Sequence, residues 1–138
     1  MKYLEAIQLL ITDYSKRGDK MPPDELLKHR DKLAGAAFYF ASYVGELKET
    51  YNLNYFQKKI TVLRETQNLI KAGNPVNKSE TDAMLQAEDL IKKELESESN
   101  AYKADLLLKQ VNKILEAMSQ RIAFLRKEVE TANYQNQG

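Results

Sequence analysis

Apolar residues recur at spacings of three and four over the last third of the chain. The members of this series are Ala101, Ala104, Leu108, Val111, Leu115, Met118, Ile122, Leu125, Val129 and Ala132. Alternating steps of three and four are typical of the buried seam of a left-handed coiled coil. The pattern predicts a long helix over about 79–132, and the residues after it, 133–138, read as a polar tail.

A second series with the same spacing runs through the middle of the chain. It consists of Leu33, Ala37, Phe40, Val44, Leu47 and Tyr51. After a five-residue step the spacing resumes with Phe56, Ile60, Leu63, Gln67 and Ile70, so the seam changes phase at this point. We expect a second long helix over about 23–72 that bends or changes its supercoil near the step.

Two short loops that combine glycine with proline separate the predicted helices, at residues 17–23 and 72–78. Pro22 and Pro23 suit a helix entry, and Gly73 suits a helix C-cap. Ser79 with an acid three residues later resembles a capping box. With a short helix over 2–16, the predicted fold class is all-α: a long antiparallel two-helix coiled-coil hairpin with a short N-terminal helix, in one domain over residues 1–132. A turn near residue 75 places residue i opposite about residue 151 minus i, so Lys58 should lie near Glu94.

The segment 33–45 carries no charged residue on any side of its predicted helix. A helix that is apolar all round is covered all round, and two long helices share only one interface. We therefore expect an oligomer of more than two chains, with a compact three-helix monomer as the alternative. The candidate interface residues are Leu33, Ala37, Phe38, Phe40, Ala41 and Val44. On this interpretation Phe40→Asp should dissociate or unfold the assembly.

Composition removes several function classes. The chain has 138 residues, no cysteine and one histidine, which excludes disulfides, thiolate metal sites and a thiol nucleophile. We expect His29 to face solvent, because it lies four residues after Glu25 whereas a di-iron bundle needs a spacing of three. No phosphate-binding loop or activated nucleophile is recognisable, so we expect no enzyme, no cofactor and no bound metal. The longest uncharged run has 13 residues, too few to cross a bilayer. We expect a soluble cytoplasmic protein without a membrane partner.

Charge is segregated along the chain although the net charge is only +1. Residues 51–78 hold five basic side chains against one acidic, and residues 79–98 hold seven acidic against two basic. One interpretation is that the two arms of the hairpin pair their charges and so fix the register. The other is an exposed strip that binds single-stranded nucleic acid through cations and stacking rings. The residues of this strip are Lys48, Tyr51, Tyr55, Lys58, Lys59 and Arg64.

The order of these features resembles the UvsY-type recombination mediators of tailed phages. The aromatic cluster in 38–43, the Gln57-Lys58-Lys59 run, the polar loop and the heptad-patterned last helix carry the resemblance. It implies a ring-forming helical protein that binds single-stranded DNA, engages the single-strand binding protein and loads a RecA-like recombinase. Lys58 and Lys59 match basic positions of that family, and Arg64 lies one residue from the next. If a phage encodes the chain, the host cytoplasm is its expected location.

A competing interpretation belongs to another class of protein. A non-catalytic helical adaptor, assembly protein or inhibitor binds another protein and no nucleic acid. Its distinguishing mark is a basic strip that is fully paired with the acidic arm. Both interpretations include a homo-oligomer.

Overall fold

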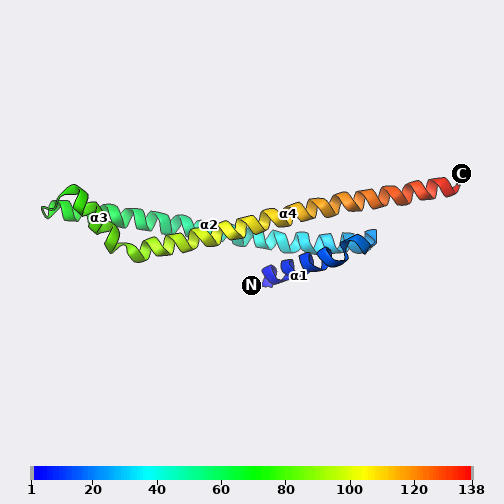
Figure 1. Cartoon of the computed structure of the whole chain (residues 1–138), viewed down its shortest axis with the longest axis horizontal. Coiled ribbons are helices and arrows are strands. Elements are labelled where there is room, and N and C mark those ends of the chain that lie inside the picture. The colour runs from blue at the N-terminus through cyan, green and yellow to red at the C-terminus, as the bar shows by residue number, and fades with distance from the viewer. Residues whose placement is uncertain (1, 138) are drawn as a thin grey trace. The chain divides into compact units, whose positions relative to one another are not determined.

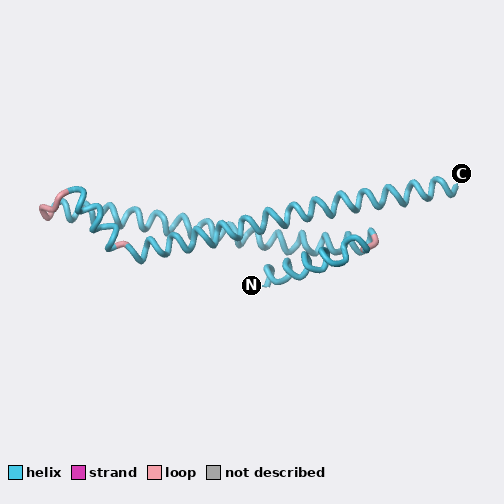
Figure 2. Tube along the Cα trace, viewed as in Figure 1, coloured by secondary structure: helices cyan, strands magenta, loops and turns pink. Residues whose placement is uncertain are grey.

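The computed structural model describes residues 2–137, and every element in that range is helical (Figures 1 and 2). In chain order these elements are α1 (Lys2–Arg17), the 3-10 turn η1 (Gly18–Lys20), α2 (Pro23–Lys71), α3 (Val76–Gln86) and α4 (Glu88–Gln137). The predicted all-α class is confirmed. The helix expected over 79–132 is two helices, and the helix expected over 23–72 is α2.

The ends of α2 follow the local sequence signals. Pro23 is its first residue, a position where proline loses no helical hydrogen bond. At the other end Gly73 adopts a left-handed backbone with φ of 95°. The amide of Gly73 donates to the carbonyl of Ile70 at 3.0 Å, and the amide of Asn74 donates to that of Leu69 at 3.1 Å. This pair of bonds is a Schellman cap, which explains why glycine ends the helix here.

The start of α3 corrects one expectation. The helix begins at Val76, directly after Pro75, and Ser79 is not its cap. Instead Ser79 is fully buried, and its hydroxyl donates to the carbonyl of Pro75 at 2.8 Å. The hydroxyl therefore satisfies a carbonyl one turn back rather than a free amide at the helix start.

Helix α3 ends after Gln86, and Ala87 separates it from α4 with φ of −91° and ψ of 14°. At its far end α4 extends to Gln137, so the expected polar tail is helical over 133–137. The side chains of 133–136 are exposed, and an exposed polar segment continues a helix when no glycine or proline interrupts it. Gly138 lies outside the described residues.

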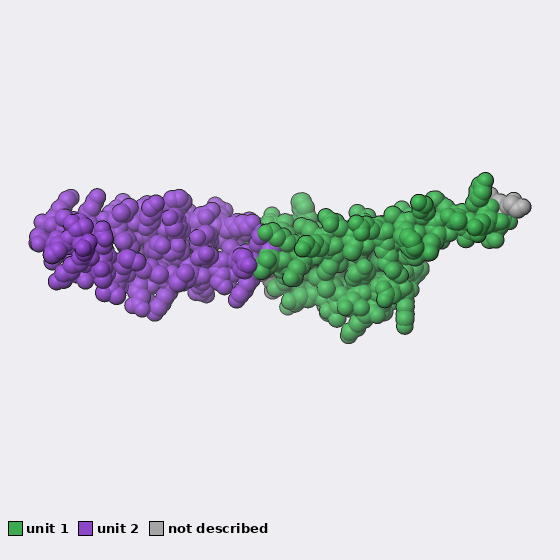
Figure 3. All heavy atoms as spheres, turned by 45° about the horizontal axis from the view of Figure 1, so that its top comes forward, with its two compact units in different colours: residues 1–43, 106–138 green, residues 44–105 purple. Residues whose placement is uncertain are grey.

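The chain divides into two compact units, drawn in green and purple in Figure 3. By their residue ranges, both long helices contribute to each unit. Unit 1 contains the chain up to Tyr43 together with the part of α4 from Leu106 onward. Its buried apolar residues are Ile7, Met21, Leu26, Leu33, Ala37, Phe40, Val111, Met118 and Ile122. All of them except Met21, which follows η1, come from α1, α2 and α4, so these three helices form most of the core of this unit.

Specific polar contacts attach α1 to α2 within unit 1. The His29 ring is buried rather than solvent-facing. Its Nε2 donates to the carbonyl of Leu10 at 2.7 Å. Arg17 bridges Asp13 on its own helix and Glu25 on α2, at 2.7 and 3.0 Å. The lone histidine is therefore part of the packing between these helices.

Unit 2 spans Val44–Asp105. Within it three side-chain contacts join α2 to α4: Lys48 with Asp105, Asn54 with Ser97, and Lys58 with Glu94. Numbers rise along α2 as they fall along α4, so the helices run antiparallel in this unit. The predicted approach of Lys58 to Glu94 is confirmed.

Candidate nucleic-acid interface

All six residues of the expected basic strip lie on α2 within unit 2. Two of its four cations are bound to acids of α4. Lys48 Nζ lies 2.9 Å from Asp105 Oδ1, and Lys58 Nζ lies 2.6 Å from Glu94 Oε2. Glu94 is buried, so Lys58 neutralises a carboxylate that would otherwise be costly to hold there. These two lysines therefore stabilise the contact between α2 and α4.

Tyr51 faces the same acidic side of α4. Its ring is half-buried, and partial removal from water is the main cause that raises the pKa of its hydroxyl. The negative charges of Glu98 and Glu94 raise this pKa further, and Lys58 partly opposes them. A phosphate approaching Tyr51 would meet these two carboxylates, so Tyr51 is a poor contact for DNA.

Tyr55 has a different environment, in which cations dominate. The Nζ atoms of Lys58 and Lys59 lie 5.1 and 5.9 Å from the centre of its ring. The ring also meets Phe56 edge to face, with 5.5 Å between ring centres. Because Lys58 is paired with Glu94, Lys59 supplies the unpaired positive charge beside this ring within the described residues.

The remaining two cations, Lys59 and Arg64, are exposed, and neither forms an ion pair within residues 2–137. They do not form one track. Each helical residue turns the chain by about 100°, so positions five apart lie about 140° apart around the axis. Three residues of the strip share one side of α2, at spacings of seven and four: Lys48, Tyr55 and Lys59. Arg64 lies on the opposite side of the helix. The expectation of a continuous strip through Arg64 is therefore corrected.

The expected oligomer interface also changes. Four of the expected interface residues are buried within a single chain: Leu33, Ala37, Phe40 and Val44. They lie on the covered face of α2. They belong to the chain's own core and offer no area to a second chain. Phe38 and Ala41 are exposed, and Phe38 is 74% exposed. The charge-free segment 33–45 is thus covered on one side only.

A different apolar surface is the main feature that the sequence analysis missed. We call it the outer stripe: Leu53, Phe56, Ile60, Leu63 and Ile70, all exposed on α2. Four of them belong to the re-phased heptad series. The five-residue step was the signal, because it moves the apolar positions away from the side of α2 that meets α4.

Other chemistry is sparse. Across the described residues no three histidine or acidic side chains converge as a metal site. In the same part of the chain, no helix has the length and apolar character needed to cross a membrane.

Comparisons of the chain with protein-family models, with curated proteins and with solved structures found no match. The resemblance to phage mediators and the adaptor alternative therefore stand as they did on sequence.

Proposed function

We propose that the chain is a recombination mediator that binds single-stranded DNA as an oligomer and helps to load a RecA-like recombinase. Its helices would form an antiparallel coiled-coil hairpin, and it would act in the cytoplasm, that of the host if a phage encodes it. The observation that carries the proposal is Lys59, an exposed cation that forms no ion pair within residues 2–137 and whose ammonium group lies 5.9 Å from the centre of the Tyr55 ring.

Single-stranded nucleic acid is bound by cations that hold phosphates and by rings on which bases stack. Lys59 supplies the first and Tyr55 the second, and Lys48 lies on the same side of α2. Lys48 remains paired with Asp105 and adds little charge. Lys58 is bound to Glu94, so it acts by supporting Tyr55 rather than by contacting DNA.

One such site per chain binds weakly, because each phosphate contact contributes modestly. Several chains that present the site to one strand raise the overall affinity through effective concentration. The proposed function therefore requires assembly. By the resemblance, the single-strand binding protein and the recombinase are the further partners.

The test is fluorescence anisotropy with a labelled single-stranded oligonucleotide across a series of salt concentrations. Lys59→Ala should weaken binding and reduce the steepness of the salt dependence, by about 0.7 in the log–log slope for each lost phosphate contact. The matched control is Lys78→Ala, which removes the same charge from an exposed site on α3. Lys58→Ala is unsuitable, because it also leaves the buried Glu94 unpaired. If Lys59→Ala and Lys78→Ala weakened DNA binding equally, binding would depend on net charge alone. That result would contradict a specific site at Lys59.

A second candidate function is a non-catalytic adaptor, assembly protein or inhibitor that binds only another protein. Two observations favour it: two of the four strip cations are paired with α4, and the outer stripe is an unpartnered apolar surface. Failure of the unmodified chain to bind single-stranded DNA at low salt would make this the better account.

A further inference from the structure

The outer stripe has the geometry of a coiled-coil seam without a partner. Its five residues are 38–64% exposed, and they follow one another at steps of three, four, three and seven. Gln67 fills the one polar position in the series. The stripe lies on the side of α2 remote from Asn54 and Lys58, which contact α4. It is therefore a second apolar seam on a helix whose first seam is already used.

A seam with this period fits one kind of partner. Side chains at alternating three and four spacings pack as knobs into the holes of another helix that runs alongside. A helix that exposes apolar residues one heptad apart and carries acids beside them would match it. The acids are required because Arg64 and Lys71 flank the outer stripe on one side. These two cations are seven residues apart, and neither forms an ion pair within the described part of the chain.

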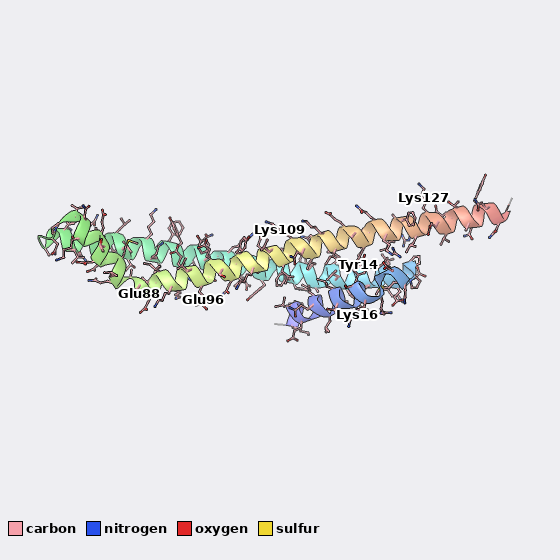
Figure 4. The ribbon with its side chains drawn as sticks, in the orientation of Figure 1. Tyr14, Lys16, Glu88, Glu96, Lys109 and Lys127 are labelled. Atoms are coloured by element: carbon pink, nitrogen blue, oxygen red, sulfur yellow. The ribbon has the colours of Figure 1, made fainter. Side chains whose placement is uncertain are left out.

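The chain itself carries such a surface on the first part of α4. Leu95 and Tyr102 are seven residues apart and are 58% and 65% exposed. Asp89 and Glu96, also seven residues apart, lie along one side of them. Both acids are exposed and, among the ion pairs of residues 2–137, neither takes part in one. Glu96 extends into solvent from α4 together with Glu88 (Figure 4).

We propose that the outer stripe of one chain packs against the Leu95–Tyr102 surface of a second copy of the same chain. Arg64 and Lys71 would then face Asp89 and Glu96 of that copy, a basic pair against an acidic pair with the same spacing. Packing of one outer stripe on another is disfavoured, because Arg64 and Lys71 of both chains would lie along the same seam. The inference rests on the assembly that the proposed function requires, and it does not depend on DNA binding.

The contact is heterologous, because it joins two different surfaces. Each chain that donates its outer stripe still offers its Leu95–Tyr102 surface to the next. Such contacts extend into a closed ring or an open filament rather than stopping at a dimer. Lys59 lies on the other side of the stripe from Arg64 and Lys71, so the proposed DNA contact stays outside this pairing.

The experiment uses full chains with one aspartate placed in either surface. Phe56→Asp changes the outer stripe, and Leu95→Asp changes the surface on α4. The matched controls are Asn68→Asp on α2 and Asn100→Asp on α4, at exposed positions outside both surfaces. Circular dichroism first establishes that each variant keeps the helix content of the unmodified chain, and light scattering then gives the mass of each alone and of the mixture.

We expect the unmodified chain and both controls to form assemblies of more than two chains. Each surface variant alone should fall to the mass of one chain, 15.9 kDa. Mixed together, the two variants should form a one-to-one dimer, because each supplies the surface that the other lacks. An unmodified chain that is monomeric at high micromolar concentration would overturn the proposal. The outer stripe would then be a binding surface for a helix of another protein. Normal assembly by Leu95→Asp, or a mixture that stays monomeric, would overturn the heterologous contact.

Discussion

The side-chain amide of Asn54 donates to the hydroxyl of Ser97 at 3.1 Å, across the buried seam between α2 and α4. The Ser97 hydroxyl in turn donates to the carbonyl of Glu94 at 2.9 Å, so the oxygen both accepts and donates. A polar pair in an apolar seam stabilises one register, because any slip leaves its groups buried without partners. The Lys58–Glu94 ion pair, one helical turn away, enforces the same register.

Removal of the amide should reveal this role. Asn54→Ala deletes a hydrogen bond between two buried side chains and should lower the free energy of unfolding by about 1–2 kcal/mol. Urea unfolding followed by circular dichroism measures the change. The exposed neighbour Asn52→Ala is the control and should change stability by less than about 0.5 kcal/mol. Equal losses for both variants would show that the buried pair contributes nothing specific.

The register itself can be tested by cross-linking. Asn54 bonds Ser97 across the antiparallel pair, and Leu47 and Ala104 lie seven residues earlier on α2 and seven residues later on α4. Cysteines introduced as Leu47→Cys and Ala104→Cys should therefore lie close enough to be linked efficiently. A pair at Leu47→Cys and Arg121→Cys should not link within one chain. Intrachain linkage of that second pair, identified by mass spectrometry on diluted protein, would contradict the register.

Alanine substitutions at two phenylalanines, two residues apart, should change the free energy of unfolding by very different amounts. Phe40 is 2% exposed in the core of unit 1, so Phe40→Ala should cost about 3–5 kcal/mol of unfolding free energy. Phe38 is mostly exposed, and Phe38→Ala should stay within about 0.5 kcal/mol. Thermal unfolding of the two variants side by side distinguishes them. A large loss at Phe38 would indicate that this ring is covered in solution.

Helix α1 should lose stability in acid. A hydrogen bond from Arg17 is the main cause that lowers the pKa of Asp13 below its ordinary value of 3.8. A depressed pKa means that the folded state favours the carboxylate, so this contribution is present above pH 3.8 and is lost as pH falls through the lower folded value. Thermal unfolding measured from neutral pH to below 3.8 should show a loss that Arg17→Gln makes smaller. Identical acid profiles for the two proteins would contradict the role of this pair.

Local and periodic signals predicted much of this fold. Gly73 ends α2 because only a left-handed backbone closes that cap, and glycine adopts it without strain. The register around Lys58 and Glu94 followed from loop length and opposed charges. Ala87 could not be predicted as a helix break, because no glycine or proline marks it and alanine favours helix.

The surfaces were harder to predict than the elements. Two apolar seams share α2, and periodicity alone does not say which one the chain covers by itself. The structure buries Phe40 and leaves Phe56 exposed. His29 was misread for a related reason: its partner is the backbone carbonyl of Leu10, and a contact nineteen residues away on another helix leaves no local pattern.

The salt dependence of single-stranded DNA binding by the unmodified chain tests the central claim most directly. We expect binding at low salt that weakens linearly on a log–log plot, and we expect Lys59→Ala to reduce both affinity and slope while Lys78→Ala changes neither. A chain that assembles yet binds no single-stranded DNA at low salt would contradict the mediator function and leave assembly as the established property.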